Sequence, residues 1–342
     1  DEPTNHLDIE SIIWLEQFLK KFKGALVMVS HDRMFLDQVT NRTIEIVNQQ
    51  IFDFKKSYSN YMVLRQELRT QQLAAQKNQE KEIQQTEKLI ERFRAKASKA
   101  SMAQSLIKKL DKIDRIKIDP EENKKIKFEF GISHQPGKII LDIQRVAKTY
   151  GDKKVLNNVN LEIERGEKIA FVGQNGQGKS TLAKIIVSEI DHEGYVKLGH
   201  NVQIGYFAQN QSTYLDGNQT VLESAEDSAT TENRTKVRDL LGAFLFPGDA
   251  VEKKVKVLSG GERNRLALCK LLLQPFNVLI MDEPTNHLEI ASKIVLKEAL
   301  LKFTGSLILV SHDRDFVQGL CEKVIAFRDQ EVRPYLGDIN AY

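Results

Sequence analysis

Cysteine is scarce in this sequence, and long apolar runs are missing. Its 342 residues include only two cysteines, Cys269 and Cys321, which excludes a disulfide scaffold, cysteine-ligated zinc sites and iron–sulfur clusters. Both lie in apolar stretches, so we expect buried thiols in a reducing cytosol. No apolar run approaches the ~18 residues of a membrane-spanning helix. With 41% hydrophobic and 28% charged residues, the chain is typical of globular proteins, and its length predicts more than one domain.

An internal repeat organises the chain. The motif Asp-Glu-Pro-Thr-Asn-His-Leu occurs at residues 1–7 and again at 282–288, and Ser-His-Asp-Arg at residues 30–33 recurs at 311–314, with the same offset of 281 residues. Two copies of one domain are therefore present. We expect a whole second copy over residues 141–342 and only the last part of a first copy over residues 1–57, whose start is missing. The absence of an initiator methionine agrees with a chain that begins partway through a gene product.

The segment between the copies is predicted to be a helical hairpin. Residues 58–118 contain no glycine or proline and are rich in helix-forming residues, and a stretch without apolar periodicity at 94–105 predicts a break between two antiparallel helices. Residues 92–117 include nine Lys or Arg but only two Asp, and this excess of positive charge favours a polyanionic partner. Turn residues then predict a connector over residues 119–140, around a short alternating run at 126–130.

The strongest motif is Gly-Gln-Asn-Gly-Gln-Gly-Lys-Ser-Thr at residues 173–181. An apolar strand is predicted before it at 169–172, and an apolar helix after it from 182 to 187. This is the pattern of a phosphate-binding loop, in which backbone amides and a helix amino terminus converge on phosphate. Lys179 is expected to hold the β- and γ-phosphates, and the Ser180 hydroxyl to ligate Mg²⁺.

Two carboxylates and a histidine follow predicted buried strands. Asp282 and Glu283 end an apolar run at 276–281, and His312 follows a second run at 307–310. The carboxyl ends of parallel strands meet at one edge of a sheet, so these side chains are expected near the phosphate loop. We assign Asp282 to the Mg²⁺ shell, Glu283 to the polarisation of an attacking water and His312 to the γ-phosphate.

The motif Leu-Ser-Gly-Gly-Glu at residues 258–262 precedes a predicted helix at 263–273. Together with the phosphate loop, it resembles the signature of ABC ATPases. The resemblance implies a RecA-like α/β core, an antiparallel β subdomain and a helical signature subdomain, in addition to the partial first domain and the hairpin. It also implies ATP and Mg²⁺ as ligands. Gln209 would reach Mg²⁺ and water, Tyr150 would stack on adenine beside Val155, and the signature would grip the γ-phosphate of ATP held by another domain.

The expected sites form five groups. The expected nucleotide contacts are Tyr150, Val155, Gly173, Asn175, Gly176, Gly178, Lys179, Ser180, Thr181, Ser259, Gly260, Gly261 and Glu262. The expected catalytic residues are Glu283, His312 and Gln209, and the metal ligands are Ser180, Gln209 and Asp282. The first-copy equivalents are Asp1, Glu2 and His31. The expected RNA contacts are Arg92, Arg94, Lys96, Lys99, Lys108 and Lys109.

Tandem domains without a membrane segment resemble the ABC-F family, soluble proteins that act on ribosomes. That resemblance implies a cytoplasmic protein whose hairpin touches ribosomal RNA and peptidyl-site tRNA, which fits a basic tip. Two alternatives stay open. An ATP-binding subunit of an ABC transporter would carry one such domain and pair with membrane helices, and a DNA-acting ABC-F protein would share every motif. Translation regulation, rescue of stalled ribosomes and antibiotic protection are not distinguished by the sequence.

Each ATP in such proteins lies between the phosphate loop of one domain and the signature of the other. This sequence has one phosphate loop, at 173–181, and one signature, at 258–262. We therefore expect it to bind ATP but to hydrolyse it slowly. Completion of the site requires a first domain in cis or a head-to-tail pair of chains.

Overall fold

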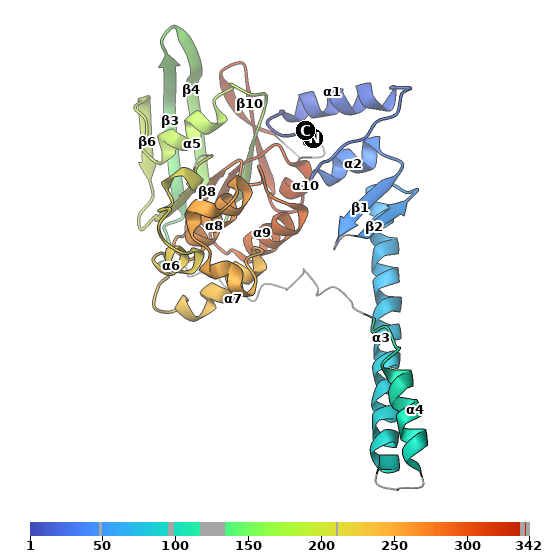
Figure 1. The fold of residues 1–342 in the computed structure, drawn as a ribbon. Helices are drawn as coiled ribbons and strands as arrows, with labels where there is room; N and C mark the ends of the chain where they lie inside the picture. The colour runs from blue at the N-terminus through green and yellow to red at the C-terminus, as the bar shows by residue number, and fades with distance from the viewer. Residues whose placement is uncertain (48–49, 95–98, 117–133, 210, 336–338, 340–342) are drawn as a thin grey trace. The chain divides into compact units, whose positions relative to one another are not determined.

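Two units make up the chain in the computed structural model. The larger unit contains residues 1–39 and 122–342, and the smaller contains residues 40–121. The structure describes all residues except 48–49, 95–98, 117–133, 210, 336–338 and 340–342 (Figure 1). The predicted run at 126–130 lies outside the described residues. No described helix is both long and apolar enough to cross a membrane.

A six-stranded sheet forms the centre of the larger unit, with the order β11-β10-β5-β9-β8-β7. All neighbours pair in parallel except β10 and β11, which are antiparallel. The strands are β5 (Lys168–Val172), β7 (Ile204–Phe207), β8 (Val278–Asp282), β9 (Ser306–Val310), β10 (Lys323–Arg328) and β11 (Glu331–Tyr335). Every residue of β8 and β9 is buried, as expected for parallel strands covered on both faces. The segments that carry the predicted chemistry follow the carboxyl ends of β5, β8 and β9.

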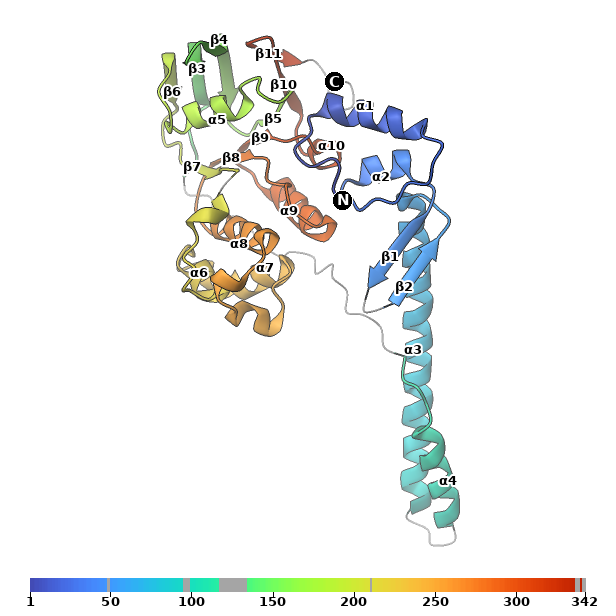
Figure 2. The ribbon, with the colours of Figure 1, turned by 45° about the horizontal axis from the view of Figure 1, so that its top comes forward.

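Successive side chains of these strands enter different cores, because side chains alternate across a sheet. Ile169 and Phe171 of β5 belong to one core, and Ala170 and Val172 belong to the other. The first core is closed by α5 (Lys179–Ile186) and by an antiparallel sheet with the order β4-β3-β6 (Figure 2). Its strands are β3 (Ile139–Tyr150), β4 (Lys153–Glu164) and β6 (Glu193–Leu198).

Helices close the second core. They are α6 (Val221–Glu226), α7 (Val237–Ala243), α8 (Gly260–Leu272), α9 (Ile290–Lys302) and α10 (Arg314–Val317), with short 3-10 turns η2 (Gln211–Tyr214), η3 (Arg234–Lys236), η4 (Gly248–Glu252) and η5 (Val255–Val257). Ile9, from the start of the chain, also packs in this core. It opens α1 (Ile9–Lys20), which is followed by α2 (Arg33–Val39). Part of the first copy is thus packed against the second.

The repeat is visible in backbone geometry. Glu2 and Glu283 both have positive φ, 45° and 49°. Their amides donate to the carbonyls of Val29 and Val310, at 2.7 and 2.9 Å. In the smaller unit, β1 (Thr43–Val47) pairs with β2 (Gln50–Phe54) in the register of β10 with β11 shifted by 281 residues. The two copies therefore share local structure as well as sequence.

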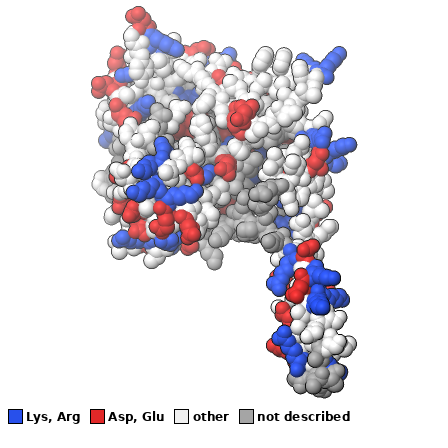
Figure 3. Space-filling model, viewed as in Figure 1, with Lys and Arg blue, Asp and Glu red and all other residues white. Residues whose placement is uncertain are grey.

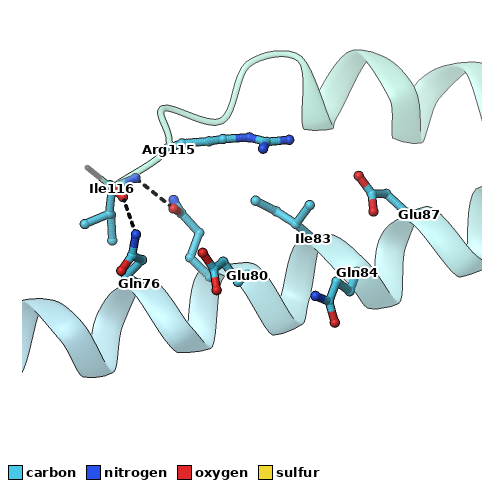
Figure 4. A pocket seen from close by; sticks show the side chains of 8 residues that line it. Gln76, Glu80, Ile83, Gln84, Glu87, Arg115 and Ile116 are labelled. Carbon is cyan, nitrogen blue, oxygen red and sulfur yellow. Dashed lines mark hydrogen bonds between the residues drawn. The ribbon is translucent and has the colours of Figure 1, made fainter. Parts of the chain in front are cut away.

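The smaller unit contains the helical hairpin, formed by α3 (Tyr58–Arg94) and α4 (Ala100–Leu110). Ile83, Ile90 and Ala103 are buried in it. The prediction of helix up to residue 118 was wrong over residues 111–116, because α4 ends at Leu110, and residues 117–118 lie outside the described residues. Beyond it the chain is held by side chains of α3 (Figure 4): Gln79 Oε1 accepts from the Ile116 amide at 2.9 Å, and Gln76 Nε2 donates to the Ile116 carbonyl at 3.2 Å. These side chains satisfy backbone groups that a helix would have satisfied internally.

Candidate functional site

The loop between β5 and α5 has a backbone that depends on glycine. Gly173, Gly176 and Gly178 all have positive φ, at 140°, 80° and 96°. A Cβ at Gly173 would lie 2.3 Å from the Phe327 carbonyl oxygen, and one at Gly178 would lie 2.7 Å from Leu156 Cδ2. Only glycine fits both the conformation and the space. The loop therefore turns tightly into the amino terminus of α5, the geometry that presents backbone amides to phosphate.

Lys179 opens α5, followed by Ser180 and Thr181 in its first turn. The Lys179 side chain folds back over the loop, where Nζ donates to the carbonyls of Gly173 at 2.7 Å and Gln174 at 2.9 Å. The residue is 5% exposed, and burial lowers the pKa of its ammonium, although the nearby Glu283 opposes this shift. A buried cation held at the loop is suited to bind an anion there.

Asp282, the last residue of β8, lies against the phosphate loop. Its Oδ1 accepts a hydrogen bond from Ser180 Oγ at 3.0 Å. The residue is 1% exposed, and burial raises its pKa, although the Ser180 hydrogen bond counteracts the rise. A hydroxyl and a carboxylate placed together are oxygen ligands of the kind that Mg²⁺ prefers, with phosphate and water completing its shell. These two residues fit the predicted metal site.

Glu283 and His312 form a second buried pair beside it. His312 Nε2 lies 3.3 Å from Glu283 Oε1, and the two side chains are 10% and 12% exposed. Burial, reinforced by the charge of Asp282, raises the pKa of Glu283 to about 8. Burial and the charge of Lys179 lower the pKa of His312 to about 4. Glu283 can therefore take up a proton near neutral pH while His312 stays neutral.

Val155 of the antiparallel sheet borders the loop, and Tyr150 belongs to the neighbouring strand of that sheet. Val155 Cγ1 would be 2.9 Å from a Cβ at Gly178, so this valine packs directly on the loop. Tyr150 ends β3 and is 48% exposed, with Lys148 Nζ 5.3 Å from its ring centroid. An exposed aromatic ring offers a stacking face for a base.

Residues of the first copy touch the phosphate loop of the second. Asp8 Oδ2 accepts from the Asn175 amide at 3.1 Å, and the Asn175 side chain donates to the His6 carbonyl at 2.7 Å. Gln174 Nε2 donates to Glu10 Oε2 at 2.6 Å. Burial alone would raise the pKa of Asp8, but hydrogen bonds from Ser11 and Asn175 bring it below the ordinary value. Sequence reasoning did not find Asp8, although it directly follows the repeated motif.

Comparison with known proteins agrees with this geometry. A family model described as ABC transporter matches residues 156–286, and a second one with the same description matches residues 44–130. Over the whole chain, the sequence is 38% identical to the "Probable ATP-binding protein YheS" of Escherichia coli K12 and 41% identical to "ABC transporter F family member 2" of Arabidopsis thaliana. The chain belongs to the ABC-F family. This ABC-F chain spans about half the length of these relatives, 54% and 51%.

The predicted fold class is confirmed. The ATP-binding subunit of an ABC transporter superposes with a TM-score of 0.52 and 20% identity, over 59% of this ABC-F chain and 91% of that chain. At this identity the match shows the fold alone. ABC-F membership supports ATP binding and, in general, ATP hydrolysis by the cassette, whereas the roles of single residues remain predictions.

Two predicted elements of the ABC-F site, Gln209 and the signature, make no hydrogen bond to the phosphate loop among the described residues. Gln209 is exposed in the turn after β7, and within the described part of the chain no hydrogen bond joins it to Ser180 or Asp282. Ser259 caps α8, accepting from the Glu262 amide at 3.2 Å, while its own amide donates to Glu262 Oε2 at 2.7 Å. This capping hydrogen bond lowers the pKa of Glu262. Ser259 and Gly260 are exposed, so they are open to a ligand from another domain.

The first-copy equivalents repeat the glutamate–histidine pairing of the second copy but not the burial of its aspartate. Glu2 Oε1 lies 3.7 Å from His31 Nε2, and Asp1 is exposed. The repeated histidines His6 and His287 meet edge to face, with ring centroids 5.6 Å apart. The two repeated motifs therefore lie against each other in this ABC-F chain.

The candidate RNA contacts lie on the hairpin. Arg92, Arg94, Lys99, Lys108 and Lys109 are exposed, whereas Lys96 lies outside the described residues. Lys99 Nζ is 4.7 Å from the ring centroid of Phe93. In the space-filling view, Lys and Arg occur along the visible face of the hairpin with acidic side chains among them (Figure 3). The tip is basic, but the hairpin as a whole has both signs of charge.

Proposed function

We propose that this chain binds Mg-ATP at the loop of residues 173–181 and hydrolyses it through Glu283. The single observation that supports this most is the placement of Glu283. It is a buried carboxyl group with a pKa of about 8, and it directly follows the carboxylate that bonds Ser180 at the phosphate loop. A buried carboxyl group whose pKa is strongly raised is typical of a catalytic site.

In this proposal each residue has one task. Lys179 and the amides of the loop hold the β- and γ-phosphates, while Ser180 and Asp282 hold Mg²⁺, which draws charge from the phosphate oxygens. Glu283 accepts a proton from water as the water oxygen attacks the γ-phosphorus, and ADP departs. His312 is neutral and can donate a hydrogen bond to the γ-phosphate.

We also propose that the signature acts on a second chain or a second domain. Ser259 and Gly260 are exposed at the amino terminus of α8, where they can bind a phosphate held elsewhere. For this chain alone, hydrolysis per chain should rise with protein concentration as head-to-tail pairs form. A rate per chain that stays constant over a hundredfold dilution would contradict this part of the proposal.

The proposed partner is the ribosome, with ribosomal RNA and tRNA bound by the hairpin. The exposed side chains of Arg92, Arg94, Lys99, Lys108 and Lys109 support it, as does membership in the ABC-F family. The test is sedimentation of the Glu283→Gln chain with ribosomes, with and without ATP. We expect ATP to increase the pelleted fraction of Glu283→Gln more than that of the parent, because slow hydrolysis prolongs the ATP-bound state.

The same experiment separates the alternatives. Pelleting with ribosomes that is independent of ATP and of the hairpin would contradict the proposal. Stronger retention on branched DNA than on ribosomes at equal salt would favour a DNA-acting member of the family. Competition with excess tRNA should lower ribosome pelleting if the hairpin binds RNA.

A further inference from the structure

The turns that follow His31 and His312 have the same construction. Asp32 Oδ1 accepts from the Phe35 amide at 2.9 Å, and Asp313 Oδ1 accepts from the Phe316 amide at 3.0 Å. Each aspartate amide donates to the serine two residues earlier, at 3.1 Å in both copies. Each histidine is therefore followed by a capped, ordered turn whose carboxylate points into the structure.

These two turns lie close to each other, so two buried carboxylates share one region. Asp32 is 9% exposed, and the Asp313 side chain is 10% exposed. Burial raises the pKa of Asp32, and the charge of Asp313 raises it further. Two like charges in a buried region need a compensating cation.

Lys293 of α9 supplies this cation and touches both turns. Its Nζ donates to Asp313 Oδ2 at 2.8 Å and to the His31 carbonyl at 3.2 Å. The side chain is 17% exposed. The repeat places Ile12 at the equivalent position of the first copy. At this position, therefore, the second copy has a cation and the first copy has none.

A second contact between the two copies also has no counterpart at the repeat-equivalent positions. Arg314, next to Asp313, pairs with Glu16 of α1, and the two side chains are 15% and 8% exposed. The repeat equivalents of this pair are Arg33 and Lys297, two cations that cannot form an ion pair. Lys297 instead bonds the Asp315 carbonyl, within the second copy. Both contacts between the copies, those of Lys293 and of Arg314, therefore depend on cations of the second copy.

We infer that Lys293 is a positioning residue that fastens the His31 turn to the His312 turn. By holding residues 1–39 in place, it also keeps Asp8 at the phosphate loop, where Asp8 Oδ2 meets the Asn175 amide. A change at either histidine turn is then transmitted to the other copy through this ammonium group, together with the Arg314–Glu16 pair. The positioning role of Lys293 does not depend on the proposed function. Only the idea that bound nucleotide is the signal passed between the copies rests on it.

The test is hydrogen–deuterium exchange of the full 342-residue chain, followed by mass spectrometry. In Lys293→Met, amides of α1 and α2 should exchange at least about tenfold faster, because a buried carboxylate loses its partner. Amides of β5 and β9 should keep the parent rate, which shows that the second copy remains folded. Lys297→Met is the matched control: it lies one turn further on the same helix and lines the same cavity of about 180 Å³.

Charge rescue separates positioning from mere packing. Lys293→Arg should retain most of the protection, whereas Lys293→Met combined with Asp313→Asn should stay loosened, because neutralising Asp313 removes the unpaired charge but does not restore the bond to the His31 carbonyl. Parent-like exchange in Lys293→Met would overturn the inference. Equal loosening in Lys297→Met, failure of the Lys293→Arg rescue, or recovery of protection in the double variant would also overturn it.

Nucleotide binding is scored separately, with a fluorescent ATP analogue. The analogue should still bind to Lys293→Met, because none of the described contacts of Lys293 is with the loop and its loss would reach the loop only through Asp8. If no variant and no parent chain binds the analogue while the exchange pattern appears as described, the proposed function fails and the role of Lys293 stands.

Discussion

Oε1 of Glu283 lies 3.3 Å from Nε2 of His312, and burial shifts the pKa values of the two groups in opposite directions. The pKa of Glu283 rises to about 8, and that of His312 falls to about 4. At neutral pH the unliganded pair is therefore mostly uncharged. This arrangement avoids a buried charge in the unliganded site. A Mg²⁺ cation held beside Asp282 would lower the pKa of Glu283 again and return the carboxylate form that takes a proton from water.

The pair makes stability depend on pH in a defined window. The pKa of Glu283 is 4.5 when unfolded and about 8 when folded, so the folded state binds more protons and stability falls as pH rises through this range. His312, with a pKa of 6.5 unfolded and about 4 folded, acts oppositely but only below pH 6.5. Between pH 6.5 and 8 the free energy of unfolding should fall by on the order of 1 kcal/mol per pH unit.

Urea unfolding at pH 6.5 and pH 8, followed by circular dichroism, measures this effect. Glu283→Gln should lose most of the dependence and should be more stable than the parent at pH 8. The same pH slope in parent and variant would show that Glu283 is not the group responsible.

Gly178→Ala should cost about 2–4 kcal/mol of stability and abolish ATP binding. The residue has a φ of 96°, and the new Cβ would lie 2.7 Å from Leu156 Cδ2 and 2.9 Å from Val155 Cγ1. Gly242→Ala is the matched control, because Gly242 lies within α7 and a Cβ there would meet no described neighbour within 4 Å. That control should be stabilised by roughly 0.5–1 kcal/mol. Equal losses in the two variants, measured by urea unfolding, would refute the steric account.

Asp8→Asn should loosen the phosphate loop without unfolding α1. The asparagine can still cap Ser11 through its oxygen, but its amide group would oppose the Asn175 amide, which now donates to Asp8 Oδ2. Amide exchange over residues 174–178 should become several-fold faster, because one charge-assisted hydrogen bond is lost. Glu289→Gln is the control at the equivalent repeat position, where the carboxylate pairs with Arg265 instead. A similar effect of both substitutions would argue against a specific contact.

Replacing Lys108 and Lys109 by Gln should weaken ribosome pelleting and reduce its salt dependence. Each lost phosphate contact lowers the slope of log affinity against log salt by about one. Lys21 and Lys23, also exposed but in the larger unit, provide a control with the same change in charge. An equal loss of pelleting in both double variants would indicate nonspecific attraction rather than binding by the hairpin.

The sequence predicted the elements that carry dense local chemistry. The strand before Gly173, the strand ending at Asp282 and the helix after Ser259 could all be placed, because glycine spacing, apolar runs and capping residues act over a few positions. Asp8 and Lys293 were missed because their roles depend on how the two copies pack, which no local pattern encodes. The end of α4 at Leu110 was missed for a similar reason, since Gln76 and Gln79 act from α3, more than 30 residues earlier.

The most direct test of the account is calorimetric titration of the chain with ATP and Mg²⁺, compared with Lys179→Ala. The account predicts one ATP bound per parent chain and affinity at least about tenfold weaker in the variant, because the buried cation at the phosphate loop is lost. Equal affinity in the two chains, or no binding to the parent, would contradict it.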